Sequence, residues 1–382
     1  MKVGILYPSS KAHPGITAEF LGGLKSFFKQ QGIESNVTLV AESIGLGGVE
    51  KDIYERAEKL LMVEEVDVLV AYIDLRILAF IEPLLFSSGK LVIVVNPGAN
   101  LPTNWISQPN VVFLTLQHAF LCSLTGALPT DASGQKAAVA TTFYDCGYLH
   151  SAAMVKSFIR SGGTIAFNYV NNQRYDANFS IKELADHLAS DDKASSLLCI
   201  FDEFPASIFY DRLNELENID GQQLFVSPMM LQEKALEKHS GFKFDIEGYM
   251  PWDIRSENDS NTLFGDSLRT HAKKEPNIFS LLGWETGLIL QQVMINAKDD
   301  FSDGVGIVET LSKADMNGPR GKMKIDPHTN YVTTPIIKCS IKNHSGKIEK
   351  ETIGIPEDEW NKFTEAPAEG ITSGWTNTYL CY

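Results

Sequence analysis

The sequence contains none of the motifs that mark the common catalytic sites. It has no Gly-x-Ser-x-Gly elbow, no Gly-x4-Gly-Lys-Ser/Thr phosphate loop and no His-Glu-x-x-His pair. Its eight histidines are scattered singly, and its five cysteines form no Cys-x-x-Cys pair. Because a metal site needs several such ligands close together, a metal centre is not indicated. We therefore expect a protein that is not an enzyme and that uses no metal and no cofactor.

Residues that could bind a ligand follow the predicted strands of the first third of the chain. Hydroxyl, carboxyl and amide groups at strand ends can hydrogen-bond a carboxylate or a carbonyl. A Pro-Gly turn also lets backbone groups approach a ligand closely, and Asn offers both donors and an acceptor. The ordinary alternatives are loop serines, a helix cap at Asp74 and a plain turn. The candidates in this part of the chain are Ser9, Ser10, Tyr72, Asp74, Gly98 and Asn100.

A second set of candidates combines tyrosines with apolar side chains in the middle of the chain. Three of them, Tyr144, Cys146 and Tyr148, cluster at the start of a predicted helix, where exposed N–H groups suit an anionic or carbonyl group. Phe204 and Met229 follow strands and would form apolar walls, with core packing as the alternative for each. Trp252 lies beside a predicted crossing between domains. The second set is Tyr144, Cys146, Tyr148, Glu203, Phe204, Met229 and Trp252.

Two series of alternating strands and helices must position these residues. The first runs from about residue 2 to 114 and the second from about 135 to 226, with continuous apolar strands such as Leu91–Val95. Such strands indicate parallel sheets with both faces covered. A chain of 382 residues is too long for one ordinary core, so we expect two doubly wound α/β domains. The last third predicts long helices at 261–272 and 278–296, then a hairpin of 322–325 with 332–342.

Five local patterns, in the correct order, resemble the leucine/isoleucine/valine-binding branch of the type I periplasmic binding proteins. Together they span residues 2–345, although each one is weak by itself. The second of them is the short Pro-containing turn that reads the ligand in that family, and the fourth is the segment that crosses back to lobe one. The patterns are KVGILYPS at 2–9, NPGAN at 96–100, DCGY at 145–148, GYMPW at 248–252 and GPRGKM at 318–323.

This resemblance implies two lobes, three hinge crossings and a ligand that is enclosed when the lobes close. Lobe one would contain residues 1–120 and 250–328. Lobe two would contain 121–249 and 329–382, with a C-terminal tail from about residue 353. The expected function is the substrate-binding component of an ABC importer, with the permease as a partner. The alternative is a cytoplasmic ligand sensor of the same fold that resembles amide-responsive regulators.

Two positions depart from the amino-acid binders of this family. Met229 stands where those proteins have the carboxylate that meets the ligand ammonium, and Ile73 with Asp74 stands where they have hydroxyl groups. An α-amino acid is therefore in doubt, although Asp74 or Glu203 could meet an ammonium from another direction. We expect a small ligand with an apolar or aromatic part and one polar head, which could be an amino acid, an amide or an aromatic acid.

The composition restricts partners and location. A net charge of −15 repels nucleic-acid backbones and anionic lipids, so we expect no nucleic acid as partner. No segment is expected to reach the ~20 apolar residues of a membrane span. The chain begins directly with a strand, which indicates a cytoplasmic protein as it stands and a periplasmic one if a signal peptide was removed. A Cys339–Cys381 disulfide is possible, with free thiols as the alternative.

Overall fold

Continuous apolar strands build the first sheet of the molecule. In the computed structural model β1 (Lys2–Tyr7), β3 (Val68–Tyr72), β4 (Leu91–Asn96) and β5 (Val111–Thr115) are almost entirely buried, and β2 (Thr38–Ser43) forms a partly exposed edge. All are parallel, in the order β2-β1-β3-β4-β5. The structure describes residues 1–105, 108–129, 133–171, 179–239, 241–297, 300–343, 347–365 and 373.

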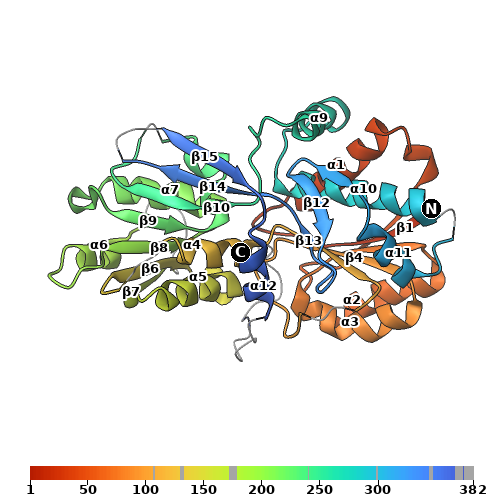
Figure 1. Cartoon of the computed structure of the whole chain (residues 1–382), viewed down its shortest axis with the longest axis horizontal. Coiled ribbons are helices and arrows are strands. Elements are labelled where there is room, and N and C mark those ends of the chain that lie inside the picture. Colours follow the sequence, from red (N-terminus) through yellow and green to blue (C-terminus); the bar gives the residue numbers. More distant parts are fainter. Residues whose placement is uncertain are drawn as a thin grey trace.

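Helices cover both faces of this sheet, which forms lobe one (Figure 1). One face packs against α1 (Ile16–Gln30), α10 (Ile278–Ala297) and α11 (Gly304–Leu311). The other packs against α2 (Glu50–Glu58) and α3 (Leu75–Ser88). The remaining elements of the lobe are α9 (Asp259–Ser267) and a small sheet of β11 (Met316–Gly318), β12 (Gly321–Ile325) and β13 (Val332–Thr333).

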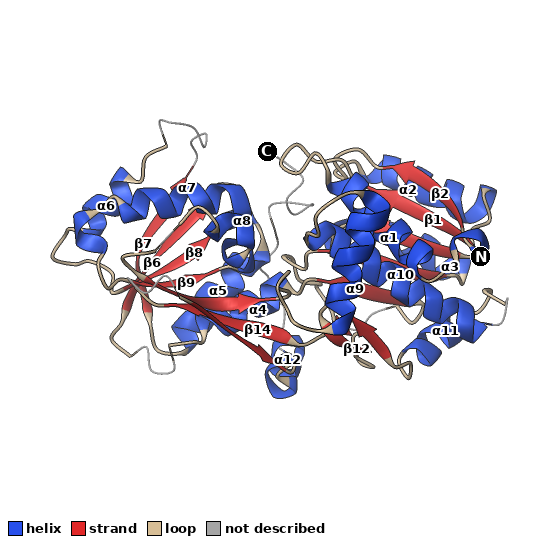
Figure 2. Ribbon diagram, turned by 90° about the horizontal axis from the view of Figure 1, so that it is seen from above, coloured by secondary structure: helices blue, strands red, loops and turns tan. Residues whose placement is uncertain are grey.

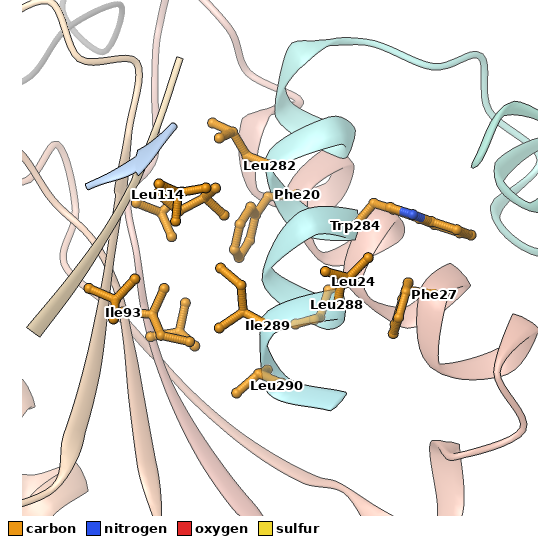
Figure 3. Close-up of a cluster of buried hydrophobic side chains, with 14 of the residues drawn as sticks. Phe20, Leu24, Phe27, Ile93, Leu114, Leu282, Trp284, Leu288, Ile289 and Leu290 are labelled. Carbon is orange, nitrogen blue, oxygen red and sulfur yellow. The ribbon is translucent and has the colours of Figure 1, made fainter. Parts of the chain in front are cut away.

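Helices α1 and α10 pack unusually closely because glycines lie where they cross. A Cβ atom at Gly23 would lie 1.9 Å from the carbonyl oxygen of Ser280, and one at Gly283 would lie 1.9 Å from that of Phe20. Any larger residue at either position would push the helices apart. Figure 3 shows side chains of both helices, among them Phe20 and Ile289, filling the space between the helices and the sheet.

The length and composition of α10 correct one expectation from the sequence. This helix has 20 residues, and an 18-residue window of it has a mean hydropathy of 1.3, so it is long and apolar enough to cross a membrane. However, 78% of that window is buried, so its apolar surface is used for packing against α1 and the sheet. The core helix of a folded lobe and a membrane span cannot be distinguished by length and composition alone.

A second sheet forms lobe two, beside the first lobe (Figure 2). Its order is β15-β14-β10-β9-β8-β6-β7. The strands β6 (Lys136–Thr142), β7 (Thr164–Asn171), β8 (Ser196–Ile200), β9 (Gln223–Val226) and β10 (Asp245–Met250) are parallel, whereas β14 (Ile336–Ile341) and β15 (Ile348–Ile353) are antiparallel. The covering helices are α4 (His118–Gly126), α5 (Leu149–Arg160), α6 (Lys182–Leu188), α7 (Glu203–Asn214) and α8 (Glu233–Leu236).

The chain passes between the lobes at three places, from β5 to α4, from β10 to α9 and from β13 to β14. The predicted fold class, two doubly wound α/β lobes with three crossings, is therefore confirmed. The late hairpin is only partly as predicted, because residues 332–342 do not form one strand. They break at Thr334 and Pro335, and β13 pairs with β12 while β14 joins the other sheet. Proline has no N–H to continue a ladder, which explains the break.

The sequence reading missed β15 and the last described helix, α12 (Glu357–Glu365). Trp360 of α12 is buried, its indole Nε1 donates to Asp326 Oδ2 at 2.8 Å, and its ring contacts Phe120 edge-on. The visible signal was Trp360 and Phe363 at helical spacing after Pro356. Cys381 lies outside the described residues, and the four described cysteines form no disulfide with one another.

Candidate ligand-binding site

The carboxyl ends of the strands in the two lobes face each other and touch. The amide N–H of His150, at the start of α5, donates to the carbonyl oxygen of Ala99 at 2.8 Å. The His13 ring Nε2 lies 2.7 Å from Asp202 Oδ2, which follows β8. We call this meeting of lobe one (His13, Ala99, Asn100) with lobe two (Leu149, His150, Asp202) the contact zone. In open α/β sheets this edge is where ligands bind.

Asn100 has a positioning role in the contact zone. Its side-chain Nδ2 donates to Asp74 Oδ1 at 2.9 Å, and its Oδ1 accepts the amide N–H of Leu149 at 3.2 Å. The first N–H groups of a helix have no partner within the helix, so the loop of lobe one satisfies two of those at the start of α5. The N-terminus of α5 was predicted to bind a ligand. In this closed arrangement its first N–H groups instead bind the loop of lobe one.

Gly98 is required by the turn that carries Asn100. Its φ is +73°, a conformation that L side chains rarely adopt, and a Cβ there would lie 2.9 Å from the backbone nitrogen of Gln117. Asn96 holds the same turn, because its Oδ1 accepts the Gly98 N–H at 2.8 Å and its Nδ2 donates to the Ile73 carbonyl at 3.0 Å. The turn is therefore fixed by its own lobe.

Ionisable groups of both lobes are buried or half-buried at the contact zone. Asp145 Oδ2 accepts the Thr142 hydroxyl at 2.8 Å and the Asp202 amide N–H at 3.2 Å. Burial, together with the negative charge of Asp202, raises the pKa of Asp145 to about 8. Burial by itself lowers the pKa of His13, but the charge of Asp202 and its hydrogen bond outweigh burial and raise that pKa. Asp145 therefore holds its proton at neutral pH while His13 and Asp202 pair across the lobes.

One cavity, of about 490 Å³, lies beside the contact zone at the start of α1, and we call it the α1-side cavity. Lobe one supplies His13 and Phe279, lobe two supplies Met229, and Trp252 lines it next to a crossing. Its charged lining is mostly acidic, with one lysine, Lys234, and one histidine. The six acidic residues are Glu19, Glu203, Glu233, Glu237, Asp253 and Glu275.

A second cavity, of about 720 Å³, lies on the other side of the contact zone, between α3 and α5, and we call it the α3-side cavity. Its charged lining is mostly basic, since Glu82 is accompanied by Arg76, Lys156 and Arg160. Aromatic rings also line it. They are Phe80, Trp105, Phe113, Tyr331 and Phe363.

The structure brings only some of the predicted site residues together. Met229, Glu203 and Trp252 line the α1-side cavity, and Asn100 lines the α3-side cavity. Asp74 and Gly98 support Asn100, and Ser10 Oγ accepts the His13 N–H at 2.8 Å.

The other predicted residues lie apart from both cavities. Phe204 is 61% exposed, and Ser9 and Cys146 are exposed as well, so they line neither cavity. Tyr144 is half-buried, Tyr148 stacks on His150, and the buried Tyr72 contacts Phe20 edge-on. Phe204 faces solvent because it lies on the outer side of α7, which the position after a strand could not reveal.

The sequence reading missed His13, Glu19, Gln232 and Phe279. His13 follows the first strand and Glu19 lies in the first turn of α1, so their positions carried a signal that went unused. Gln232 and Phe279 carried none, because they reach the cavity from elements far along the chain. Within the described ranges, no three His, Cys, Asp or Glu side chains gather closely enough to hold a metal ion.

Comparison with known proteins agrees with this architecture. A family model described as periplasmic binding protein matches residues 2–344. A solute-binding protein of an ABC transporter from R. palustris, solved with benzoate, has a TM-score of 0.72 at 20% identity, over 92% of this chain and 97% of that one. An ABC transporter substrate-binding protein from Sphaerobacter thermophilus has a TM-score of 0.73 at 15% identity, over 92% and 96%.

A branched-chain amino acid transporter substrate-binding protein from Streptococcus pneumoniae, solved with isoleucine, is similar at a TM-score of 0.67. It is 14% identical, over 92% of this chain and 99% of that one. At these identities the similarity establishes the fold. Among curated protein sequences, none matches this chain significantly.

Proposed function

Since the chain belongs to the periplasmic binding protein family, we propose that it binds a small molecule between its lobes as the substrate-binding component of an ABC importer. The observation that carries the proposal is the α1-side cavity, which both lobes line beside their contact zone. Neither lobe alone would enclose a ligand there. The proposal includes no catalytic step, and it places the protein outside the cytoplasmic membrane, with the permease as its partner.

The cavity fits a ligand of the size bound by the similar solved proteins. Its volume of about 490 Å³ is within the ~300–1,000 Å³ of small-molecule sites. Met229, Trp252 and Phe279 offer apolar walls, which suit a ligand with an aliphatic or aromatic part. Benzoate and isoleucine, the ligands of two similar structures, both have such a part.

The lobes would open to admit the ligand and close to enclose it. They are joined by short segments such as Leu116–Gln117 and Thr334–Pro335, so a few backbone torsions can change their relative orientation. We propose that the moving bodies are residues 1–120 with 250–328, and 121–249 with 329–382, with two changes at their edges. Strand β13 moves with the first body because it pairs with β12, and α4 moves with the second body from His118 onward. Helix α12, within the last range, contacts both Asp326 and Phe120 and so lies against the hinge.

Small-angle scattering during a ligand screen tests the proposal. A ligand that raises the melting temperature should also reduce the radius of gyration, because it stabilises the closed form. Ala99→Cys with His150→Cys provides the matched control, because a 2.8 Å backbone hydrogen bond joins these residues across the lobes and a disulfide there would hold the lobes closed. When oxidised, this variant should be compact without ligand. A wild-type radius that stays constant with saturating ligand would contradict the proposal.

A further inference from the structure

The charges of the α1-side cavity are unevenly neutralised. Three of its six acidic residues already have a basic partner. Asp253 Oδ2 lies 2.7 Å from Lys350 Nζ, Glu275 Oε2 lies 3.0 Å from Arg269 Nε, and Glu233 pairs with Arg255. Two others, Glu19 and Glu203, lie closer to the contact zone and are less well compensated.

Glu203 lies on α7 of lobe two, and only 21% of its side chain is exposed. Lys234 Nζ lies 3.9 Å from its carboxylate, at the limit of an ion pair, and the charge of His13 also acts on it. Burial raises the pKa of Glu203, Lys234 opposes this, and the neighbouring charge of Asp202 adds to it. The carboxylate therefore lacks the close partner that a buried charge needs.

Glu19 lies opposite, in the first turn of α1 in lobe one, and it is half-buried. No hydrogen bond or ion pair of its carboxylate is found among the described residues. The electrostatic influence of Glu19 reaches both His13 and Glu203. Closing the lobes therefore brings two carboxylates of opposite lobes into one cavity. His13 lies near both and offsets part of their repulsion, but it already pairs with Asp202, so a further cation in the cavity would favour closure.

An independent observation at the same cavity also points to a ligand. Gln232 is only 8% exposed and lines the cavity, yet its side-chain Nε2 has no hydrogen-bond partner in the described part of the chain. An unpartnered buried amide costs free energy, which a ligand oxygen at this position would recover. The site therefore presents two acceptors for a cation and one donor for an oxygen.

We propose that the ligand of the α1-side cavity is a small organic cation with a hydrogen-bond acceptor, held between Glu19 and Glu203 with its acceptor at Gln232. This inference rests on the proposed function and names the substrate class of that site. The cation would relieve the repulsion between the lobes, so ligand charge would control closure. An aromatic or aliphatic acid such as benzoate would meet the same two carboxylates and be repelled.

Four compounds with one carbon skeleton test this directly by calorimetry at pH 7 and low ionic strength. Leucinamide is a cation with a carbonyl, leucine a zwitterion, 4-methylpentanamide neutral and 4-methylpentanoate an anion. Leucinamide should bind at least tenfold more tightly than the neutral amide, and the anion should bind most weakly. If the neutral amide or the anion binds as tightly as leucinamide, or if none of the four binds, the cationic class is wrong.

Variants assign the effect to the two carboxylates. Glu203→Gln and Glu19→Gln should each weaken leucinamide binding at least tenfold. The neutral amide should bind these variants at least as tightly as it binds the wild type, because less repulsion opposes closure. Glu275→Gln is the matched control, because Glu275 lines the same cavity but is paired with Arg269, and it should change affinity less than twofold. Equal losses for all three variants would overturn the proposal. An anion that closes the lobes in scattering would refute the cation and leave the proposed function standing.

Discussion

The two cavities lie on opposite sides of one contact zone, yet their linings carry opposite charge. The α1-side cavity has six acidic residues with Lys234 and His13, whereas the α3-side cavity has Arg76, Lys156 and Arg160 with Glu82. Both contain large apolar side chains. Size and hydrophobicity therefore do not distinguish them, and charge decides which molecules each can hold.

The contrast also shows how one protein can carry a net charge of −15 without being uniformly acidic. The acidic α1-side cavity lies at the start of α1, and its lobe-two lining includes Glu203 and Glu237. The basic α3-side cavity lies between α3 and α5. The contact zone separates them, because Asn100 and His13 join the lobes along the boundary. A ligand in one cavity would thus meet little of the other's charge.

The largest effect should come from reversing one charge in the α1-side cavity. Glu203→Lys replaces an attraction of the proposed cation by a repulsion, worth up to ~4 kcal/mol at 4 Å near a surface. Leucinamide affinity should fall by roughly 100-fold or more. Glu82→Lys makes the same change in the α3-side cavity and should leave affinity within twofold. Calorimetry on both variants checks this, and the opposite ranking would mean that the α3-side cavity binds the ligand.

A smaller effect is expected from removing the Asn100 side chain from the contact zone. Asn100→Ala removes the hydrogen bonds of Asn100 to Asp74 and to the Leu149 N–H in the closed form, a loss of about 1–3 kcal/mol. Because Asn100 acts on closure, binding of every ligand should weaken by the same factor. Titrations with leucinamide and leucine would show it. Asn104→Ala is the control, because Asn104 lines the same cavity as Asn100 but is exposed. A loss confined to one ligand would indicate that Asn100 contacts that ligand directly.

The buried carboxyl of the contact zone should produce a pH-dependent difference. The pKa of Asp145 is raised to about 8 from 3.8, so folding holds its proton and stability is lost as the pH rises between these values. Asp145→Asn removes this loss. Its melting temperature should exceed that of the wild type by several degrees at pH 8, with a difference that grows with pH and levels off above about pH 8.

Thermal melts from pH 5 to 9 measure this difference. Asp186→Asn, at an aspartate with 65% of its side chain exposed, should show no such trend. His13, whose pKa is also raised, acts in the same direction, because its pair with Asp202 is complete below pH 6.5 and is lost at higher pH. A difference between Asp145→Asn and wild type that shrinks with rising pH would contradict the burial of a protonated Asp145.

The smallest effect is expected from filling the α3-side cavity. Ala152→Trp adds a large ring there and should change leucinamide affinity less than twofold. Ala12 lines the α1-side cavity, so Ala12→Trp makes the identical change on the other side and should weaken binding at least tenfold. If Ala152→Trp is the more damaging of the two, the assignment of the ligand to the α1-side cavity is wrong.

Much of the fold was predictable because its signals are local. Apolar runs such as Leu91–Val95 are continuous, and a strand buried on both faces needs no alternation. The break at Thr334–Pro335 and the exposed strand β15 were harder, because their partners lie in another part of the chain. For the site, Gly98 and Glu203 were both predicted to face a ligand. The sequence did not reveal that Gly98 shapes the turn that carries Asn100, whereas Glu203 lines the α1-side cavity.

By itself the sequence determined the two α/β lobes, the strand ends that face each other and the excess of acidic residues, since periodicity, turn residues and charge are read locally. Only the tertiary structure decided which polar groups meet. His13 reaches Asp202 across 189 positions of the chain, and Asn100 reaches Leu149 across 49. Which carboxylates are neutralised depends on distances of a few ångströms between lobes, because Coulomb energies and hydrogen bonds change steeply over that range.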